Sequence, residues 1–231
     1  MMFSDGMVLN VDCLLALDLM SDNHVDLIWT DPAYKVVSGG TKRAEELGYG
    51  YNRSVLHKND GKIFKHNKVK PSDYMARMFR VLKPGGHCYV MTNRINLEAM
   101  LTSARLAGFS LANLLFWGKD NKNPNRMYMI ETEVILMFYK RPAVKIADCG
   151  QSQIIKIPTV KKPEKTHPTQ KPVELPAYFI EQSSEPDDLV LDPFLGNGAT
   201  AIAAAQLGRR FVGMELDREY YEQACARLAF V

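Results

Sequence analysis

Short apolar runs alternate with helical patterns along most of this chain, and this alternation limits the fold more than any other feature. The runs have the length and the β-branched or aromatic content of buried strands; they lie at residues 7–12, 25–29, 88–91, 111–117, 133–139, 189–192 and 211–215. Helical patterns follow at residues 13–20, 72–82, 96–107, 176–182, 199–207 and 217–228. This order predicts an α/β fold with a mostly parallel sheet and helices on both faces.

The size and composition of the chain suit a single domain. Its 231 residues, 46% of them hydrophobic, are enough for a substantial core, so we expect residues 1–231 to form one domain. No run of about 18 uncharged apolar residues predicts a membrane span, and residues 1–12 lack the pattern of a secretion signal. The four cysteines are far apart, which predicts reduced thiols in the cytoplasm and no metal site.

Basic residues are concentrated in two segments. Residues 35–70 hold nine Lys or Arg and three acidic residues, and residues 119–171 hold eleven and five, so each segment carries a local charge of +6. Because the net charge is +3, the rest of the chain carries −9. Two basic segments on an acidic body predict a polyanion bound on one face, although solvated loops can have the same composition.

Residues 25–34, VDLIWTDPAY, begin as a strand and stop at an Asp-Pro pair. Since proline has no N–H to give to a sheet, Asp31, the Pro32 carbonyl and Tyr34 are presented at the carboxyl end of a strand, where ligands bind in open α/β sheets. Two acceptors can hold both N–H groups of an exocyclic base amine, and Tyr34 can stack on an extruded base. An ordinary turn at a strand end fits the same residues.

Residues 189–200, LVLDPFLGNGAT, predict a strand, a glycine-rich turn and a helix. Gly196 and Gly198 let the backbone approach a ligand, and the N-terminus of the helix offers free N–H groups. Glu215 ends the next strand, where a carboxylate can accept both hydroxyls of a ribose. A dinucleotide-dependent enzyme also fits, because Gly196-x-Gly198-x-x-Ala201 satisfies the looser glycine fingerprint.

Three motifs taken together are more specific than any one of them. DPAY at 31–34, HPTQKP at 167–172 and DPFLGNGAT at 192–200, in this order, resemble the β class of amino-group DNA methyltransferases. Those enzymes use S-adenosyl-L-methionine (AdoMet) and methylate adenine N6 or cytosine N4. The resemblance extends from about residue 10 to the end. It implies a Rossmann-like sheet of seven strands, with one reversed strand in an edge hairpin of residues 111–117 and 133–139.

The resemblance also implies the site residues. The catalytic positions are Asp31, Pro32 and Tyr34. The cofactor-binding positions are Asp12, Thr169, Lys171, Asp192, Pro193, Phe194, Gly196, Gly198, Thr200 and Glu215. Among these, the Phe194 to Gly198 turn lines the methionine and sulfonium, Thr169 and Lys171 meet the carboxylate, Glu215 binds the ribose, and Asp12 binds the adenine amine. His167 is expected to be a structural turn residue.

Two features depart from the family pattern. Ala33 stands where the family has a second proline, which removes a backbone restraint of about 0.4–1 kcal/mol but no functional group. The target-recognition region is a short insert at residues 141–166, so reading of the DNA sequence is either limited, or shared with the loop at 35–70 or with a second subunit of a homodimer. We expect the loop at 35–70, which has no periodicity, to be mobile and to contact DNA.

The resemblance predicts a site-specific enzyme that methylates adenine N6 in double-stranded DNA, of the kind found in restriction-modification systems. Cytosine N4 is the alternative target. The same residues also admit a catalytically silent nucleic-acid-binding subunit, an NAD-dependent oxidoreductase or an RNA-methylating enzyme. Methylation of cytosine C5 is disfavoured, because the sequence has no Pro-Cys pair and its cysteines have no activating neighbours.

Overall fold

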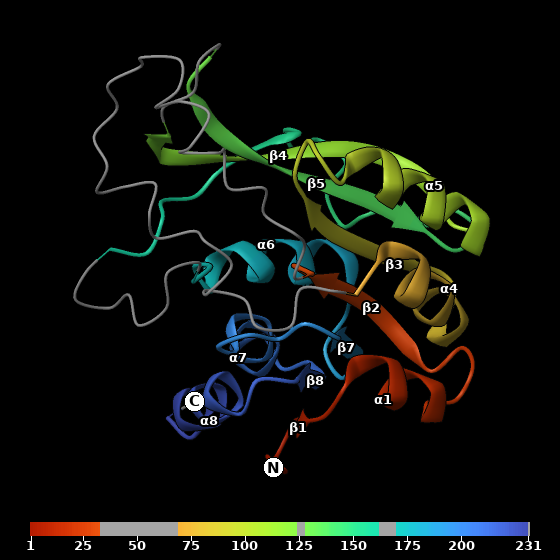
Figure 1. Cartoon of the computed structure of the whole chain (residues 1–231), viewed down its shortest axis with the longest axis vertical. Helices are drawn as coiled ribbons and strands as arrows, with labels where there is room; N and C mark the ends of the chain where they lie inside the picture. The colour runs from red at the N-terminus through yellow and green to blue at the C-terminus, as the bar shows by residue number, and fades with distance from the viewer. Residues whose placement is uncertain (33–68, 124–127, 162–169, 231) are drawn as a thin grey trace, which may run out of the picture. The chain divides into compact units, whose positions relative to one another are not determined.

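The computed structural model describes residues 1–32, 69–123, 128–161 and 170–230 (Figure 1). Two compact units make up the chain, Met1–Pro32 with Pro71–Val231 and Ala33–Lys70, and the elements below all lie in the first. The described strands are β1 (Gly6–Asn10), β2 (Val25–Thr30), β3 (Leu82–Thr92), β4 (Ser110–Asn123), β5 (Ile130–Tyr139), β6 (Ile154–Lys156), β7 (Leu189–Asp192) and β8 (Arg210–Glu215). The described helices are α1 (Cys13–Leu19), α4 (Pro71–Val81), α5 (Leu97–Ala107), α6 (Glu174–Ser183), α7 (Ala199–Gln206) and α8 (Arg218–Leu228).

All the described strands join one sheet in the order β1-β8-β7-β2-β3-β5-β4-β6. Strand β5 runs antiparallel to both of its neighbours, and the other pairings are parallel. The predicted α/β class and the single reversed strand are therefore confirmed. The predicted number of seven strands is wrong, because β6 pairs with β4 and makes an eighth strand at the edge. Its three residues are too few to show an alternating pattern.

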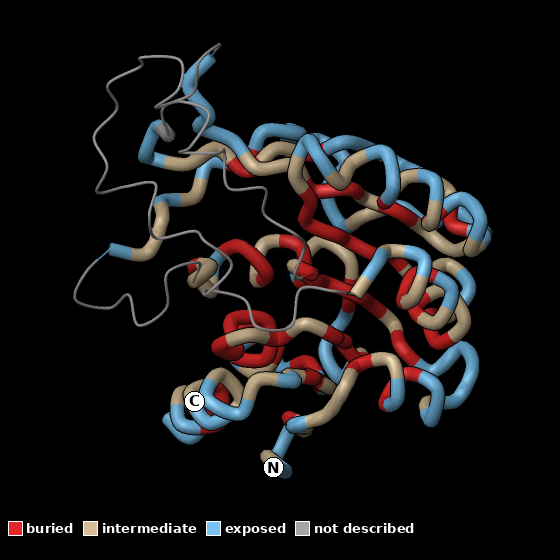
Figure 2. The backbone as a smooth tube through the Cα atoms, viewed as in Figure 1, coloured by how far each residue is buried: buried red, intermediate tan, exposed pale blue. Residues whose placement is uncertain are grey.

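Helices cover both faces of the sheet (Figure 1). Helices α1, α4 and α5 pack together on one face, and α6, α7 and α8 pack on the other. Burial is strongest along the central strands (Figure 2), and all four residues of β7 are buried. Trp29 of β2 stacks on Phe179 of α6 with 4.6 Å between ring centroids, which joins the sheet to the second helical layer.

Pairing within the sheet moves one predicted helix boundary. The pattern predicts a helix from Ser72 that buries Leu82 and stops at residues 83–86, but α4 begins at Pro71 and ends at Val81. Leu82 opens β3 instead, because it pairs with Val25 of β2. Proline suits the first turn of a helix, where its missing N–H costs nothing.

Two helix caps agree with the patterns in the sequence. Gly108 ends α5 in the left-handed region at φ 107°, and the Asp217 side chain caps α8 by accepting from the Glu219 N–H at 2.9 Å. Asp12, expected at the end of a strand, caps α1 through the Leu14 N–H at 2.8 Å. No helix within the described residues is long and apolar enough to cross a membrane.

Candidate active site

The carboxyl ends of β2 and β7 lie side by side at one edge of the sheet. The two strands are parallel neighbours, with Ile28 in register with Leu191. At their tips the Thr30 hydroxyl donates to Asp192 Oδ1 at 2.7 Å, inside the protein. Asp31 directly follows Thr30, so the Asp31-Pro32 pair and the motif of residues 192–200 meet at this edge. The tertiary structure thus brings together segments that are about 160 residues apart.

Asp192 is a buried acid whose oxygens are taken up by the protein. It is 4% exposed and accepts from the Thr30 hydroxyl, the Phe194 N–H at 3.0 Å and the Thr200 hydroxyl at 2.6 Å. Burial raises the pKa of the Asp192 carboxyl to about 6, against the opposing effect of these three donors. Asp192 and Thr200 therefore fasten β2, β7 and α7 to one another.

Asp31 pairs with the lysine of the third motif. The Lys171 ammonium lies 2.6 Å from Asp31 Oδ2 and 3.5 Å from Glu133 Oε2 of β5. The side chains are 27%, 16% and 28% exposed for Asp31, Lys171 and Glu133, so the cluster is only partly open to water. Residue 171, the Asp-Pro pair and the glycine-rich turn thus lie at the same end of the sheet. Pro32 is buried.

The glycine-rich turn connects β7 to α7 and has the backbone shape that glycine allows. Gly196 has φ 57° and Gly198 has φ 93°. A Cβ on Gly198 would lie 3.1 Å from the Ala224 Cβ of α8, whereas a Cβ on Gly196 would have nothing within 4 Å. The turn therefore packs against α8 on one side and leaves open space beside Gly196.

Glu215 ends β8 beside this turn. Its Oε2 accepts from the Gly196 N–H and its Oε1 from the Asp217 N–H, both at 2.8 Å. Burial raises the pKa of the Glu215 carboxyl, and these backbone donors oppose the shift. Each oxygen keeps a further lone pair, so the carboxylate can still accept from two hydroxyl groups.

Asn197 is the residue of the turn that fits a missing ligand. Asn197 is 7% exposed, and its Nδ2 atom is buried with no hydrogen-bond partner among the described residues. A buried amide without a partner is costly, so a bound molecule that reached this nitrogen would remove the cost. With the open space at Gly196 and the Glu215 carboxylate, this donor suits a nucleoside ligand such as AdoMet.

A cation of the last helix supports the turn from behind. The Arg227 Nη1 donates to the Asn197 carbonyl at 2.6 Å. Burial lowers the pKa of the Arg227 guanidinium, although it remains charged at neutral pH. Phe194 packs edge-on against Tyr74 of α4, with 5.1 Å between ring centroids. The turn is thus held by both helical layers.

The described structure places most of the predicted site residues at this edge. Asp31, Pro32, Lys171, Asp192, Pro193, Phe194, Gly196, Gly198, Thr200 and Glu215 lie at or beside the ends of β2, β7 and β8. Asp12 follows β1, whose last residue, Asn10, is in register with Glu215. Tyr34 and Thr169 lie outside the described residues, as does most of the loop at 35–70. The individual roles of the site residues stay predictions.

Several residues that shape the site were not found from the sequence. Thr30, Lys119, Glu133 and Arg227 contact site residues directly or through one neighbour. Charge alone does not single out Lys119 and Glu133, because Asp120, Lys122 and Glu131 lie beside them in the same strands. Hydrophobic patterns cannot show which charged residues meet, because that depends on the order of strands in the sheet.

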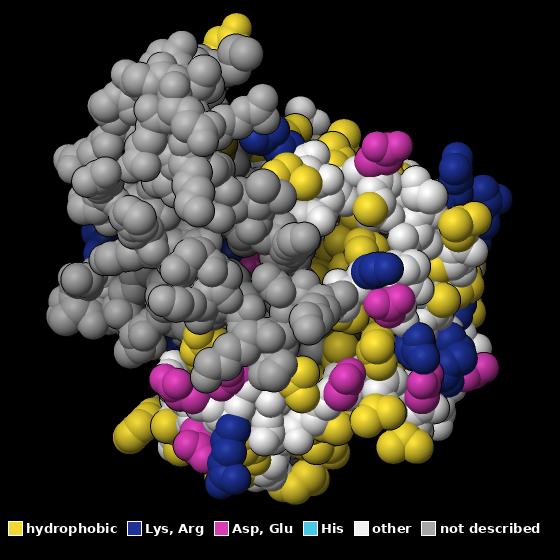
Figure 3. All heavy atoms as spheres, viewed as in Figure 1, with side chains coloured by type: hydrophobic (Ala, Val, Ile, Leu, Met, Phe, Trp, Pro, Cys, Tyr) yellow, Lys and Arg dark blue, Asp and Glu magenta, His cyan; other side chains and the backbone are white. Residues whose placement is uncertain are grey.

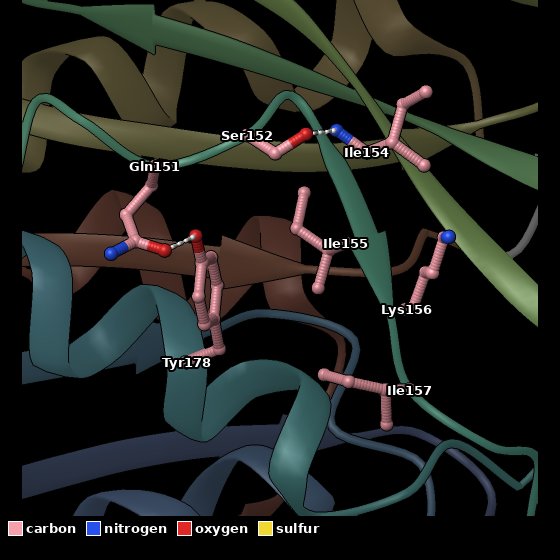
Figure 4. A pocket seen from close by; sticks show the side chains of 7 residues that line it. All are labelled: Gln151, Ser152, Ile154, Ile155, Lys156, Ile157 and Tyr178. Carbon is pink, nitrogen blue, oxygen red and sulfur yellow. Dashed lines mark hydrogen bonds between the residues drawn. The ribbon is translucent and has the colours of Figure 1, made fainter.

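Surface charge and a pocket away from the site do not indicate a second functional site. On the face in Figure 3, described Lys and Arg side chains are interspersed with Asp and Glu side chains, as expected for a solvated surface. A half-open pocket of about 210 Å³ lies between β6 and α6; it is lined by Gln151, Ser152, Ile154, Ile155, Lys156, Ile157 and Tyr178 (Figure 4). This pocket contains none of the predicted site residues. No group of His, Cys, Asp and Glu in the described part of the chain could hold a metal ion.

Alanine substitutions at the two glycines of the turn are expected to differ in their main effect, which is on stability at Gly198 and on AdoMet affinity at Gly196. Gly198→Ala is expected to destabilise the fold by about 1–2 kcal/mol, since alanine disfavours the left-handed region and would crowd Ala224. Gly196→Ala meets no protein atom but has the same left-handed strain at φ 57°, roughly 1–2 kcal/mol. Its methyl group enters the open space, so AdoMet affinity should fall about tenfold or more. Thermal unfolding and calorimetric titration with AdoMet measure both effects. Equal AdoMet affinity of Gly196→Ala and wild type would contradict the assignment.

Known proteins have sequences similar to most of this chain. The family model described as DNA methylase, for N6 and N4 methylation, matches residues 25–226. The type II methyltransferase M2.DpnII of Streptococcus pneumoniae is 30% identical over 236 residues, which cover 94% of this chain and 87% of the relative. The type II methyltransferase M2.MboI of Moraxella bovis is 29% identical over 228 residues, which cover 91% and 83%.

Solved structures agree on the fold. The M1.HpyAVI complex with SAM superposes with a TM-score of 0.71 at 23% identity, covering 96% of this chain and 99% of that one. The PvuII DNA methyltransferase, described as cytosine-N4-specific, has a TM-score of 0.72 at 19% identity, with 97% and 86% covered. Because the family model spans most of the chain, the protein belongs to the N6/N4 DNA methylase family of the β class, the AdoMet-dependent amino-methyltransferases of DNA.

Proposed function

We propose that this protein transfers a methyl group from AdoMet to the N6 amine of adenine in double-stranded DNA, after the base has left the helix. The observation that carries the proposal is the position of Asp31, which lies at the tip of β2, against Lys171 and beside the β7 turn. Methylation of a base amine needs an acceptor for the amine N–H groups and a binding site for the nucleoside cofactor, and both would lie at this edge of the sheet.

The protein's part in the reaction is to prepare the amine. Its lone pair is delocalised into the base ring, so the amine is a poor nucleophile. Asp31 and the Pro32 carbonyl would accept its two N–H groups, and the Asp31 carboxylate would stabilise positive charge that develops on nitrogen. When bound, AdoMet supplies an electrophilic methyl group on its sulfonium. The N–CH₃ bond would form as the S–CH₃ bond breaks, leaving a neutral thioether, and the amine nitrogen would pass one proton to solvent.

The remaining residues would hold the two reactants. The Asn197 amide, the open side of Gly196 and the Glu215 carboxylate would bind the nucleoside and its ribose hydroxyls. Thr169 and Lys171 would meet the AdoMet carboxylate, and Asp12 the adenine amine of AdoMet. Tyr34 would stack on the extruded base. Adenine is the proposed target base and cytosine the alternative, and the identity of the methylated nucleoside decides between them.

DNA contacts would come from the two basic segments. The loop at 35–70 is proposed to close on DNA beside the base pocket, and the insert at 141–166 to read the site. The insert is short for this task, and in the described part of the chain β6 takes up three of its residues. A second subunit is therefore proposed to share the recognition of the DNA sequence.

The test is methyl transfer with identification of the product. Purified protein is incubated with methyl-labelled AdoMet and duplex DNA or RNA, and the nucleic acid is digested to nucleosides and separated by chromatography. The expected product is N6-methyldeoxyadenosine from DNA. N4-methyldeoxycytidine would instead favour the cytosine-N4 activity named for the PvuII enzyme of the same fold. Binding of AdoMet with no transfer to any nucleic acid would overturn the proposal in favour of a silent subunit.

A further inference from the structure

Four charged side chains of alternating sign form a line that ends at Asp31. Lys119 of β4 lies 3.0 Å from Glu133 Oε1 of β5, Glu133 Oε2 lies 3.5 Å from Lys171, and Lys171 lies 2.6 Å from Asp31 Oδ2. Their side chains are only 7–28% exposed. Glu133 and Lys119 belong to the hairpin of β4 and β5 and to none of the three sequence motifs.

This line of side chains connects the hairpin of β4 and β5 to the tip of β2. Strand β3 lies between β2 and β5, so no backbone hydrogen bond joins Asp31 to Glu133. Lys171 comes from the segment that precedes α6 and lies against both carboxylates. The position of its ammonium group is therefore set jointly by a catalytic-motif acid and by a residue of the hairpin.

Trp117 gives the line a rigid support. It pairs directly across the hairpin with Glu133, is 2% exposed, and donates from its indole N–H to the Ile157 carbonyl at 2.7 Å. The ammonium groups of Lys119 and Lys171 lie 5.9 Å and 6.0 Å from the centre of its ring. Both cations are thus near the negative face of one immobile ring, which favours a single arrangement of the two lysines.

The electrostatics keep the two central members of the line, Glu133 and Lys171, charged. Burial opposes ionisation of Glu133, but the ammonium groups of Lys171 and Lys119 outweigh it and lower the pKa of the Glu133 carboxyl. Burial likewise opposes the charge of Lys171, but Asp31 and Glu133 outweigh it and raise the pKa of the Lys171 ammonium. One ammonium is shared by two carboxylates, so Glu133 offsets part of the Lys171 charge that Asp31 would otherwise face alone.

We propose that Glu133, backed by Lys119, is a positioning residue for methyl transfer. It holds Lys171 where the ammonium orients the Asp31 carboxylate without neutralising it as an acceptor for the base amine. This inference rests on the proposed role of Asp31. If Glu133 loses its charge, Lys171 stays in contact with Asp31 but its positive charge is no longer shared with a second carboxylate. The ammonium then competes more strongly with the amine N–H for the Asp31 carboxylate.

The same hairpin contains an ordinary ion pair for comparison. Glu131 lies 3.3 Å from Lys122, and these side chains are 52% and 65% exposed. Exposed pairs of this kind contribute little, because water and salt screen them, whereas partly buried charges cost desolvation and need partners. Glu131 is two residues from Glu133 on β5 and has no contact with Lys171 or Asp31 among the described contacts, so it is a matched control.

The experiment is steady-state methylation of duplex DNA by Glu133→Gln, with Glu131→Gln as control. Glu133→Gln keeps the size of the side chain but removes the charge, and kcat is expected to fall about tenfold or more, as displacement of a catalytic group does. Glutamine keeps an acceptor oxygen for Lys119, so the thermal midpoint should fall by only a few degrees, roughly 2–4 °C. The dissociation constant of AdoMet should change by a smaller factor than kcat does, because Lys171 keeps its place beside Asp31. Glu131→Gln should match wild type in all three measurements. Glu133→Asp, which restores the charge, should recover part of kcat.

A second pair of variants keeps the test decisive if Glu133→Gln folds poorly. Lys119→Gln should also lower kcat, by a smaller factor than Glu133→Gln does. Because Lys119 acts through Glu133, adding Lys119→Gln to Glu133→Asp should lower kcat by no more than Lys119→Gln does in wild type. A kcat of Glu133→Gln equal to wild type would overturn the inference. So would a loss confined to AdoMet affinity, because the line would then serve cofactor binding.

Failure of the inference can be separated from failure of the proposed function. If Asp31→Ala is inactive and Glu133→Gln is fully active, Asp31 keeps its role and Glu133 loses its own. If Asp31→Ala still methylates DNA, the proposed site is wrong, and a loss of kcat in Glu133→Gln could not then act through Asp31. Both results contradict the inference, and only the second contradicts the site.

Discussion

Replacement of Asp31 by alanine is expected to lower kcat for DNA methylation by about 10³-fold or more, while AdoMet still binds. The carboxylate is the acceptor proposed to hold the amine and stabilise its developing charge, and it lies against Lys171 rather than inside the glycine-rich turn. Radiolabelled methyl transfer measures kcat, and calorimetric titration measures AdoMet affinity. The conservative Asp31→Asn keeps an acceptor oxygen but no charge, and should lose about 10²-fold.

The matched control for this prediction is Asp18→Ala. Asp18 is an acid of α1 in an ion pair with Arg77 at 2.8 Å, with side chains 50% and 34% exposed. Loss of an exposed pair costs little stability and touches no site residue, so kcat should stay within about twofold of wild type. Turnover by Asp31→Ala at the level of this control would contradict the catalytic assignment.

The second large effect is expected on stability, at Asp192. Asp192→Ala removes the acceptor of the Thr30 hydroxyl, the Thr200 hydroxyl and the Phe194 N–H, all at the buried junction of β2, β7 and α7. Donors left without partners, together with the cavity, should cost about 3–5 kcal/mol of the free energy of unfolding. For a chain of this size the thermal midpoint should fall by roughly 6–20 °C. Thermal unfolding followed by circular dichroism measures it.

The pH dependence of Asp192→Asn provides an independent check. Burial raises the pKa of the folded Asp192 carboxyl to about 6, above its ordinary value of 3.8, so the folded state holds this proton more tightly than the unfolded state does. The contribution of Asp192 to stability is therefore full below pH 3.8 and decreases as the pH rises to about 6. An asparagine side chain at this position cannot titrate, so the loss of stability in Asp192→Asn should be larger at pH 4 than at pH 8. An equal loss at both pH values would contradict this account.

The local elements of the fold were readable from the sequence where a pattern was strong. The strand before Asp31, the strand and turn before Ala199, and the cap at Asp217 follow from apolar runs, glycine and capping chemistry. Where tertiary pairing competes with a local pattern, the prediction was wrong. Leu82 continues a helical period but joins β3, and the three residues of β6 become a strand only because β4 offers them an edge.

The order of the motifs along the chain was enough to indicate the family, the α/β class and AdoMet as cofactor, because each motif is a local signal of residue types and spacing. What the tertiary structure alone decided is which charges meet. Lys171 was predicted to face a cofactor carboxylate, and it lies against Asp31 and Glu133, which come from strands separated by β3. Such contacts depend on the order of the strands and on the packing of Trp117. The spacing of residues along one segment predicts neither of these.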